Sequence, residues 1–63
     1  MVDPTATVDE SAVLGEGTAV WGYASVMAGV RTGTHCSIGR GAEVGRDTRM
    51  GDSVRISFGV FLP

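Results

Sequence analysis

The sequence of 63 residues contains no lysine, asparagine or glutamine, and it has only one cysteine and one histidine. Because Cys36 is alone, no intramolecular disulfide can form. One cysteine and one histidine also cannot supply a multi-ligand metal cage within one chain, so we expect no bound metal. A lone cysteine without a disulfide framework is typical of a reducing compartment, which predicts a cytoplasmic protein.

Charge of one sign and long apolar runs are also scarce. Five arginines and seven carboxylates give a formal net charge of -2, spread along the chain. This balance disfavours nucleic acid or an anionic membrane as a partner. The longest uncharged stretch, residues 17–30, is interrupted by Gly22 and Gly29 and is too short to span a bilayer. The N-terminus lacks a basic segment, so we expect neither a signal peptide nor a membrane anchor.

A six-residue repeat organises the chain. Every sixth residue from Val2 onwards is Val, Ile, Leu or Met at ten of eleven positions, where chance would give about three. This aliphatic column consists of Val2, Val8, Leu14, Val20, Val26, Thr32, Ile38, Val44, Met50, Ile56 and Leu62. The column two residues earlier is small or β-branched throughout, and it includes Cys36. Glycine recurs three places after the aliphatic residue, where it permits a sharp corner.

The repeat predicts a single all-β domain over residues 1–63. Two inward side chains on each short strand, followed by a corner, make one side, and three such sides close a turn of 18 residues. Residue k then stacks on residue k+18 at a spacing of roughly 4.8 Å, so Val20, Ile38 and Ile56 should form one ladder. The result is a parallel β-solenoid of about three and a half coils.

The repeat resembles that of the hexapeptide-repeat left-handed β-helix proteins, in which a small residue is followed by any residue, an aliphatic residue and a small or acidic one. The match runs in phase from Val2 to Leu62. The resemblance implies a triangular, left-handed parallel β-helix. The opening coils, above all Val20 and Trp21 followed by V-M-A-G-V-R, look like those of bacterial sugar-nucleotide acetyltransferases.

That family resemblance also implies an activity. Such enzymes are homotrimers that move an acetyl group from acetyl-CoA to an amine or hydroxyl of a nucleotide-linked sugar, in active sites between subunits. Acetyl-CoA would be a co-substrate, with no permanently bound cofactor. Relatives are usually much longer, so the chain resembles their N-terminal portion and, at its C-terminus, a truncated enzyme. The alternative is a non-catalytic oligomeric scaffold or assembly module derived from such an enzyme.

Catalytic candidates are few. His35 is the only side chain whose ordinary pKa lies near neutrality, so it is the candidate general base for acetyl transfer, with a plain surface role as the alternative. Its column points outward at a corner. Arg31 and Arg49 are 18 residues apart and should stack, where they could meet a CoA phosphate or form a solvated ion-pair face. Trp21 and Tyr23 should lie at a corner, in subunit packing or lining a cleft.

Two inward positions are interpreted as structural. Cys36 falls in the small inward column, where a polarizable side chain packs well. Thr32 is the one polar residue of the aliphatic column, and a buried hydroxyl must find a partner, so we expect it to bond to a backbone carbonyl.

Overall fold

The computed structural model describes residues 1–62 and contains only β-strands and corners. Pro63, the last residue of the predicted domain, lies outside the described residues. Seven two-residue strands follow one another, namely β1 (Thr7–Val8), β2 (Ala19–Val20), β3 (Ser25–Val26), β4 (Ser37–Ile38), β5 (Glu43–Val44), β6 (Arg55–Ile56) and β7 (Phe61–Leu62). Within residues 1–62 there is no helix with the length and apolar character needed to cross a membrane. The prediction of an all-β chain is confirmed.

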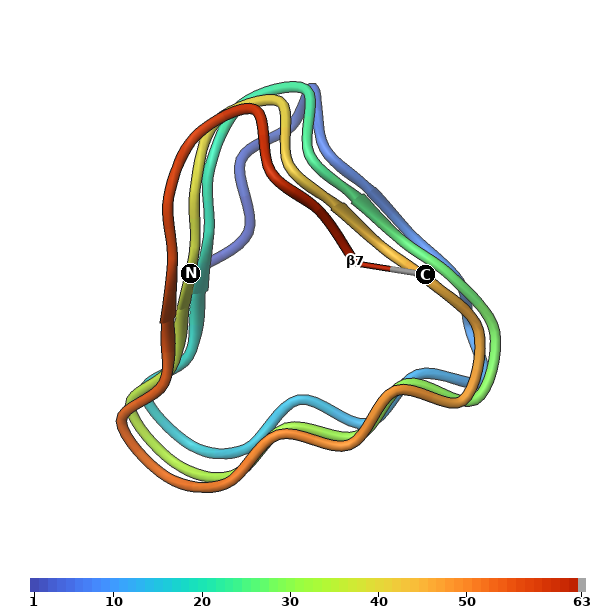
Figure 1. Ribbon diagram of the computed structural model, residues 1–63, viewed down its shortest axis with the longest axis vertical. Coiled ribbons are helices and arrows are strands. Elements are labelled where there is room, and N and C mark those ends of the chain that lie inside the picture. The colour runs from blue at the N-terminus through green and yellow to red at the C-terminus, as the bar shows by residue number, and fades with distance from the viewer. Residues whose placement is uncertain (63) are drawn as a thin grey trace.

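The strands pair in parallel at a constant offset of 18 residues. One sheet has the order β1-β3-β5-β7 and the other the order β2-β4-β6. On the third side, isolated parallel bridges join Val13 to Arg31 and Arg31 to Arg49. The backbone therefore traces three-sided turns that lie on top of one another, as Figure 1 shows down the stack. The predicted parallel register is confirmed on all three sides.

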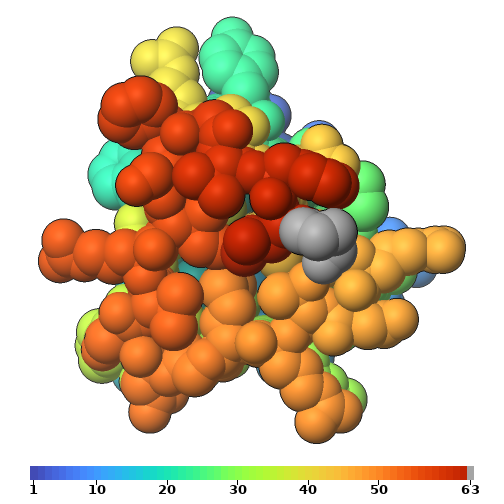
Figure 2. Space-filling view, viewed as in Figure 1, coloured from blue at the N-terminus to red at the C-terminus, as the bar shows by residue number. Residues whose placement is uncertain are grey.

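The core fills the inside of these turns. Val20 pairs with Ile38 and Ile38 with Ile56, and all three are buried, as the aliphatic column predicts. Cys36 is buried as well, with its Sγ 3.1 Å from the carbonyl oxygen of Gly51. Other side chains project outward around the rim of the stack (Figure 2). Val2 is more exposed than its column predicts, at 48%, because within residues 1–62 the first coil has a neighbour on one side only.

Each corner from residue 17 onwards has a residue in the left-handed region, with φ between 57° and 76°. These residues recur every six positions and are Gly17, Tyr23, Gly29, His35, Gly41, Asp47, Ser53 and Gly59. The glycines were expected from the sequence. The other four adopt a conformation that costs about 1–2 kcal/mol for a residue with a Cβ. The rhythm of the backbone therefore overrides local preference at half of these corners.

Thr32 lies at a buried polar junction. Its Oγ1 donates to the carbonyl oxygen of Gly33 at 3.1 Å and accepts from the backbone N–H of Gly15 at 2.9 Å. The hydroxyl of Thr18 lies 3.3 Å away and bonds to the same carbonyl. The expected bond to a carbonyl is confirmed, and the contact with Gly15 explains why a polar residue is accommodated here.

Replacing Thr32 by valine should lower the free energy of unfolding by about 1–3 kcal/mol, because the buried Gly15 N–H loses its acceptor while the packing volume is kept. Urea unfolding followed by circular dichroism measures the loss. Thr34→Val, at an exposed corner, is the matched control and should change stability by less than about 0.5 kcal/mol. Equal effects of the two variants would contradict the role assigned to the Thr32 hydroxyl.

Candidate functional site

His35 lies at an exposed corner, as its column predicts. Its backbone has φ 57°, and its N–H donates to the carbonyl oxygen of Glu16 at 2.8 Å. The imidazole covers Gly17 of the preceding coil so closely that a Cβ there would lie 2.7 Å from Cδ2 of His35. Neither of the two surface hollows described below includes His35. Its role as a base stays a prediction.

Arg31 and Arg49 occupy adjacent coils in register, so the predicted stacking is confirmed, and both side chains are exposed. The carboxylate of Asp52 accepts from the backbone N–H of Thr34 at 2.9 Å and so helps to hold a corner. Two cations on one face, one strand spacing apart, favour an anionic partner. A phosphate contact for these arginines stays a prediction.

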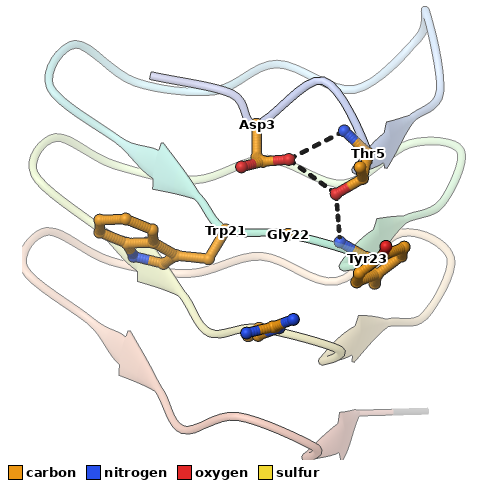
Figure 3. Close-up of a pocket in the computed structure, with 6 residues that line it drawn as sticks. Asp3, Thr5, Trp21, Gly22 and Tyr23 are labelled. Atoms are coloured by element: carbon orange, nitrogen blue, oxygen red, sulfur yellow. Dashed lines mark hydrogen bonds between the residues drawn. The ribbon is translucent and has the colours of Figure 1, made fainter.

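A hollow of about 370 Å³ lies at another corner, and we call it the aromatic hollow (Figure 3). Gly22 lies between Trp21 and Tyr23, whose rings point to opposite sides, and the first coil provides one wall. The lining residues are Asp3, Thr5, Trp21, Gly22, Tyr23 and Arg40. The predicted corner position of the two aromatic residues is confirmed.

Hydrogen bonds fix the wall that the first coil provides. Asp3 Oδ1 accepts from the backbone N–H of Thr5 at 2.9 Å and from its hydroxyl at 2.6 Å. The Thr5 hydroxyl oxygen in turn accepts from the backbone N–H of Tyr23 at 3.0 Å. This relay joins the first coil to the second and sets Asp3 beside the backbone of Gly22 (Figure 3).

The rings of the aromatic hollow are also held in place. Trp21 Nε1 donates to the hydroxyl of Ser37 in the next coil at 3.2 Å. The guanidinium carbon of Arg40 lies 5.8 Å from the centroid of the Tyr23 ring, a distance typical of a cation–π contact. The second and third coils are thus tied together by the side chains that line the hollow.

A second hollow of about 310 Å³ repeats this polar frame six residues later. Asp9 Oδ1 accepts from the N–H and hydroxyl of Ser11, and the Ser11 hydroxyl accepts from the N–H of Gly29. Arg46 lines this hollow as Arg40 lines the first, but Met27 replaces the tryptophan. The hexapeptide period therefore places one acid, one hydroxyl and one arginine at each of two corners, with aromatic rings at only one.

The hydrogen bonds lower the pKa of both aspartates. For Asp3 the largest cause is the hydroxyl of Thr5, and for Asp9 it is the backbone N–H of Ser11. The charges of Arg40 and Arg46 contribute in the same direction, whereas desolvation opposes the shift. Both carboxylates therefore favour the ionised form in the folded chain.

Acid should destabilise the fold through these two corners. Because the folded pKa lies below the ordinary value of 3.8, the stabilisation is present above that value and is lost as the pH falls through the lowered pKa. The midpoint of thermal unfolding, followed by circular dichroism, should fall between about pH 5 and about pH 2.5. The double variant Asp3→Asn, Asp9→Asn should flatten this fall, whereas Glu10→Gln should not. An unchanged pH profile in the double variant would contradict the assignment.

Sequence reasoning did not single out Asp3, Thr5 or Arg40. The signal was present, because an acid and a hydroxyl two residues apart occur at Asp3 with Thr5 and again at Asp9 with Ser11. Across the described part of the chain, no three His, Cys, Asp or Glu side chains gather where they could hold a metal ion. The site is thus a shallow, mixed polar and aromatic surface suited to binding.

Comparison with known proteins yields no assignment. No family model matches this chain, and neither the curated proteins nor the solved structures contain a match to it.

Proposed function

We propose that the chain is a left-handed β-helix of the hexapeptide-repeat acyltransferase superfamily and that it takes part in acetyl transfer from acetyl-CoA to an amine or hydroxyl of a nucleotide-linked sugar. The observation that carries the proposal is the pairing of residue k with k+18 on every side, combined with corners in the left-handed region every six residues. This double rhythm is the one that the family's repeat implies. A homotrimer with active sites between subunits is part of the proposal.

The chemistry requires a base and an anion site. The acceptor nitrogen or oxygen forms a bond to the acetyl carbonyl carbon, the carbon–sulfur bond breaks, and the proton of the acceptor passes through the base to the departing CoA thiolate. His35 is the base in this proposal, and its exposed corner leaves room for a neighbouring subunit to enclose it. Arg31 and Arg49 form the cationic pair for the phosphates of CoA.

A non-catalytic assembly module is the second candidate. The observation that favours it is the position of His35, which packs over Gly17 and lies outside both hollows. The exposed rings of Trp21 and Tyr23 suit packing between chains, since aromatic side chains are enriched in interfaces. Such a module would associate with itself or with a longer homologue.

Isothermal titration with acetyl-CoA, together with a thiol-release assay on nucleotide-linked amino sugars, separates the two candidates. The enzyme should bind acetyl-CoA and release CoA, and His35→Gln should lower kcat by about 100-fold or more while Glu10→Gln leaves it unchanged. Absence of heat at millimolar acetyl-CoA would remove the enzymatic proposal and leave the module. Light scattering that shows a stable monomer would contradict the trimer in both.

A further inference from the structure

Opposite charges flank the aromatic hollow. Asp3 belongs to the first coil and Arg40 to the third, and the backbone of Gly22 in the second coil lies between them. The guanidinium lowers the pKa of the Asp3 carboxyl, so the two groups sense each other's charge across the hollow. Both hydrogen bonds to Asp3 go to Oδ1, as the dashed lines in Figure 3 show, and its other oxygen remains available.

The aromatic rings are kept at an energetic cost. Tyr23 holds φ 59° although a bulky residue rarely adopts the left-handed region, and its side chain is 65% exposed. Glycine occupies the equivalent corner one repeat earlier, at Gly17, and one repeat later, at Gly29, without this strain. Strain at an exposed ring points to a role for the ring itself, since burial does not compensate for it.

The floor of the hollow is open to a ligand. Gly22 has no side chain, and a Cβ there would lie 3.2 Å from the hydroxyl oxygen of Thr5, so a larger residue would crowd the wall of the hollow. A volume of about 370 Å³ falls within the range of small-ligand sites, and the lining combines aromatic rings with a few polar groups as such sites do.

We propose that the aromatic hollow binds a zwitterionic ligand that carries both an ammonium and a carboxylate group, of which a free α-amino acid is the simplest. The guanidinium of Arg40 donates to the ligand carboxylate, and the available oxygen of Asp3 accepts from the ligand ammonium. The faces of Trp21 and Tyr23 add attraction for the cation and apolar area for the side chain of the ligand. This binding is separate from the proposed acetyl transfer and needs neither His35 nor acetyl-CoA.

The second hollow serves as an internal comparison. Asp9 and Arg46 reproduce the two charges, but Met27 and Ala28 take the places of Trp21 and Gly22. Because the aromatic faces are missing there, the ligand should bind at the aromatic hollow and not at its repeat. Charge substitutions at the second hollow therefore control for general effects of lost charge.

Titration of the intrinsic fluorescence of Trp21, the only tryptophan of the chain, tests the proposal directly. L-Leucine should change the emission saturably, whereas N-acetyl-L-leucine, without the ammonium, and L-leucinamide, without the carboxylate, should bind about tenfold more weakly or worse. Asp3→Asn and Arg40→Gln should each weaken L-leucine binding by a similar factor, and Asp9→Asn and Arg46→Gln should leave it unchanged.

Equal binding of L-leucine and either derivative to the unmodified protein would overturn the proposal, as would the absence of a saturable change. This comparison needs no variant and so holds even if Asp3→Asn impairs folding. Equal weakening by Asp9→Asn or Arg46→Gln would also overturn it. Acetyl-CoA in a separate titration distinguishes failure here from failure of the proposed acetyl transfer, since the two ligands use different residues.

Discussion

Ile38→Ala should unfold a large fraction of the molecules at ordinary temperature. Ile38 is the largest fully buried side chain, and its strand pairs with β2 on one side and β6 on the other. Removing its branched side chain from the middle of the stack should cost about 2–5 kcal/mol in lost burial and residual cavity. A domain of this size has a total stability of only about 3–9 kcal/mol, so the loss is comparable with the whole.

The matched control for this substitution is Val13→Ala. Val13 is also paired with the next coil, but its side chain points outward and is 54% exposed, so its loss should cost less than about 0.5 kcal/mol. Urea unfolding followed by circular dichroism compares the two variants. A midpoint for Ile38→Ala within error of that for Val13→Ala would contradict the inward aliphatic column as the source of stability.

Most of the fold was predictable because the repeat imposes the same local solution many times. The aliphatic column placed Val20, Ile38 and Ile56 in one ladder, and the parallel register between them is the one observed. A period of six fixes which side chains face inward, and three sides fix the offset of 18, so no long-range information beyond the sequence pattern is required. Thr32 follows the same logic, because a hydroxyl in that column had to bond to backbone.

The aromatic hollow was only partly predictable. Trp21 and Tyr23 were placed at a corner, but Asp3 and Arg40 come from other coils, and their approach depends on side-chain direction at a corner. Column position tells which residues face outward and does not tell how they lean. The strained backbone at Tyr23 and His35 was also not foreseen, since the repeat geometry prevails over the local preference of a residue with a Cβ.

Gly33→Ala should be the other strongly destabilising change, through a clash and not a cavity. A Cβ on Gly33 would lie 2.8 Å from the backbone nitrogen of Asp52 and 2.8 Å from the carbonyl carbon of Gly51, and it would overlap a carboxylate oxygen of Asp52. The next coil would have to move away, which breaks the bond from the Thr34 N–H to that carboxylate. Overpacking against rigid backbone should cost about 3 kcal/mol.

Gly51→Ala is the control that isolates this cause. Gly51 occupies the same position one coil later, with no atom within 4 Å of the site of a Cβ, and its φ is not in the left-handed region. Its replacement should be neutral or should stabilise the protein slightly, because alanine restricts the unfolded chain. Thermal unfolding of both variants measures the difference. If the two alanines lowered the midpoint equally, close approach of successive coils at Gly33 could not be the reason for glycine there.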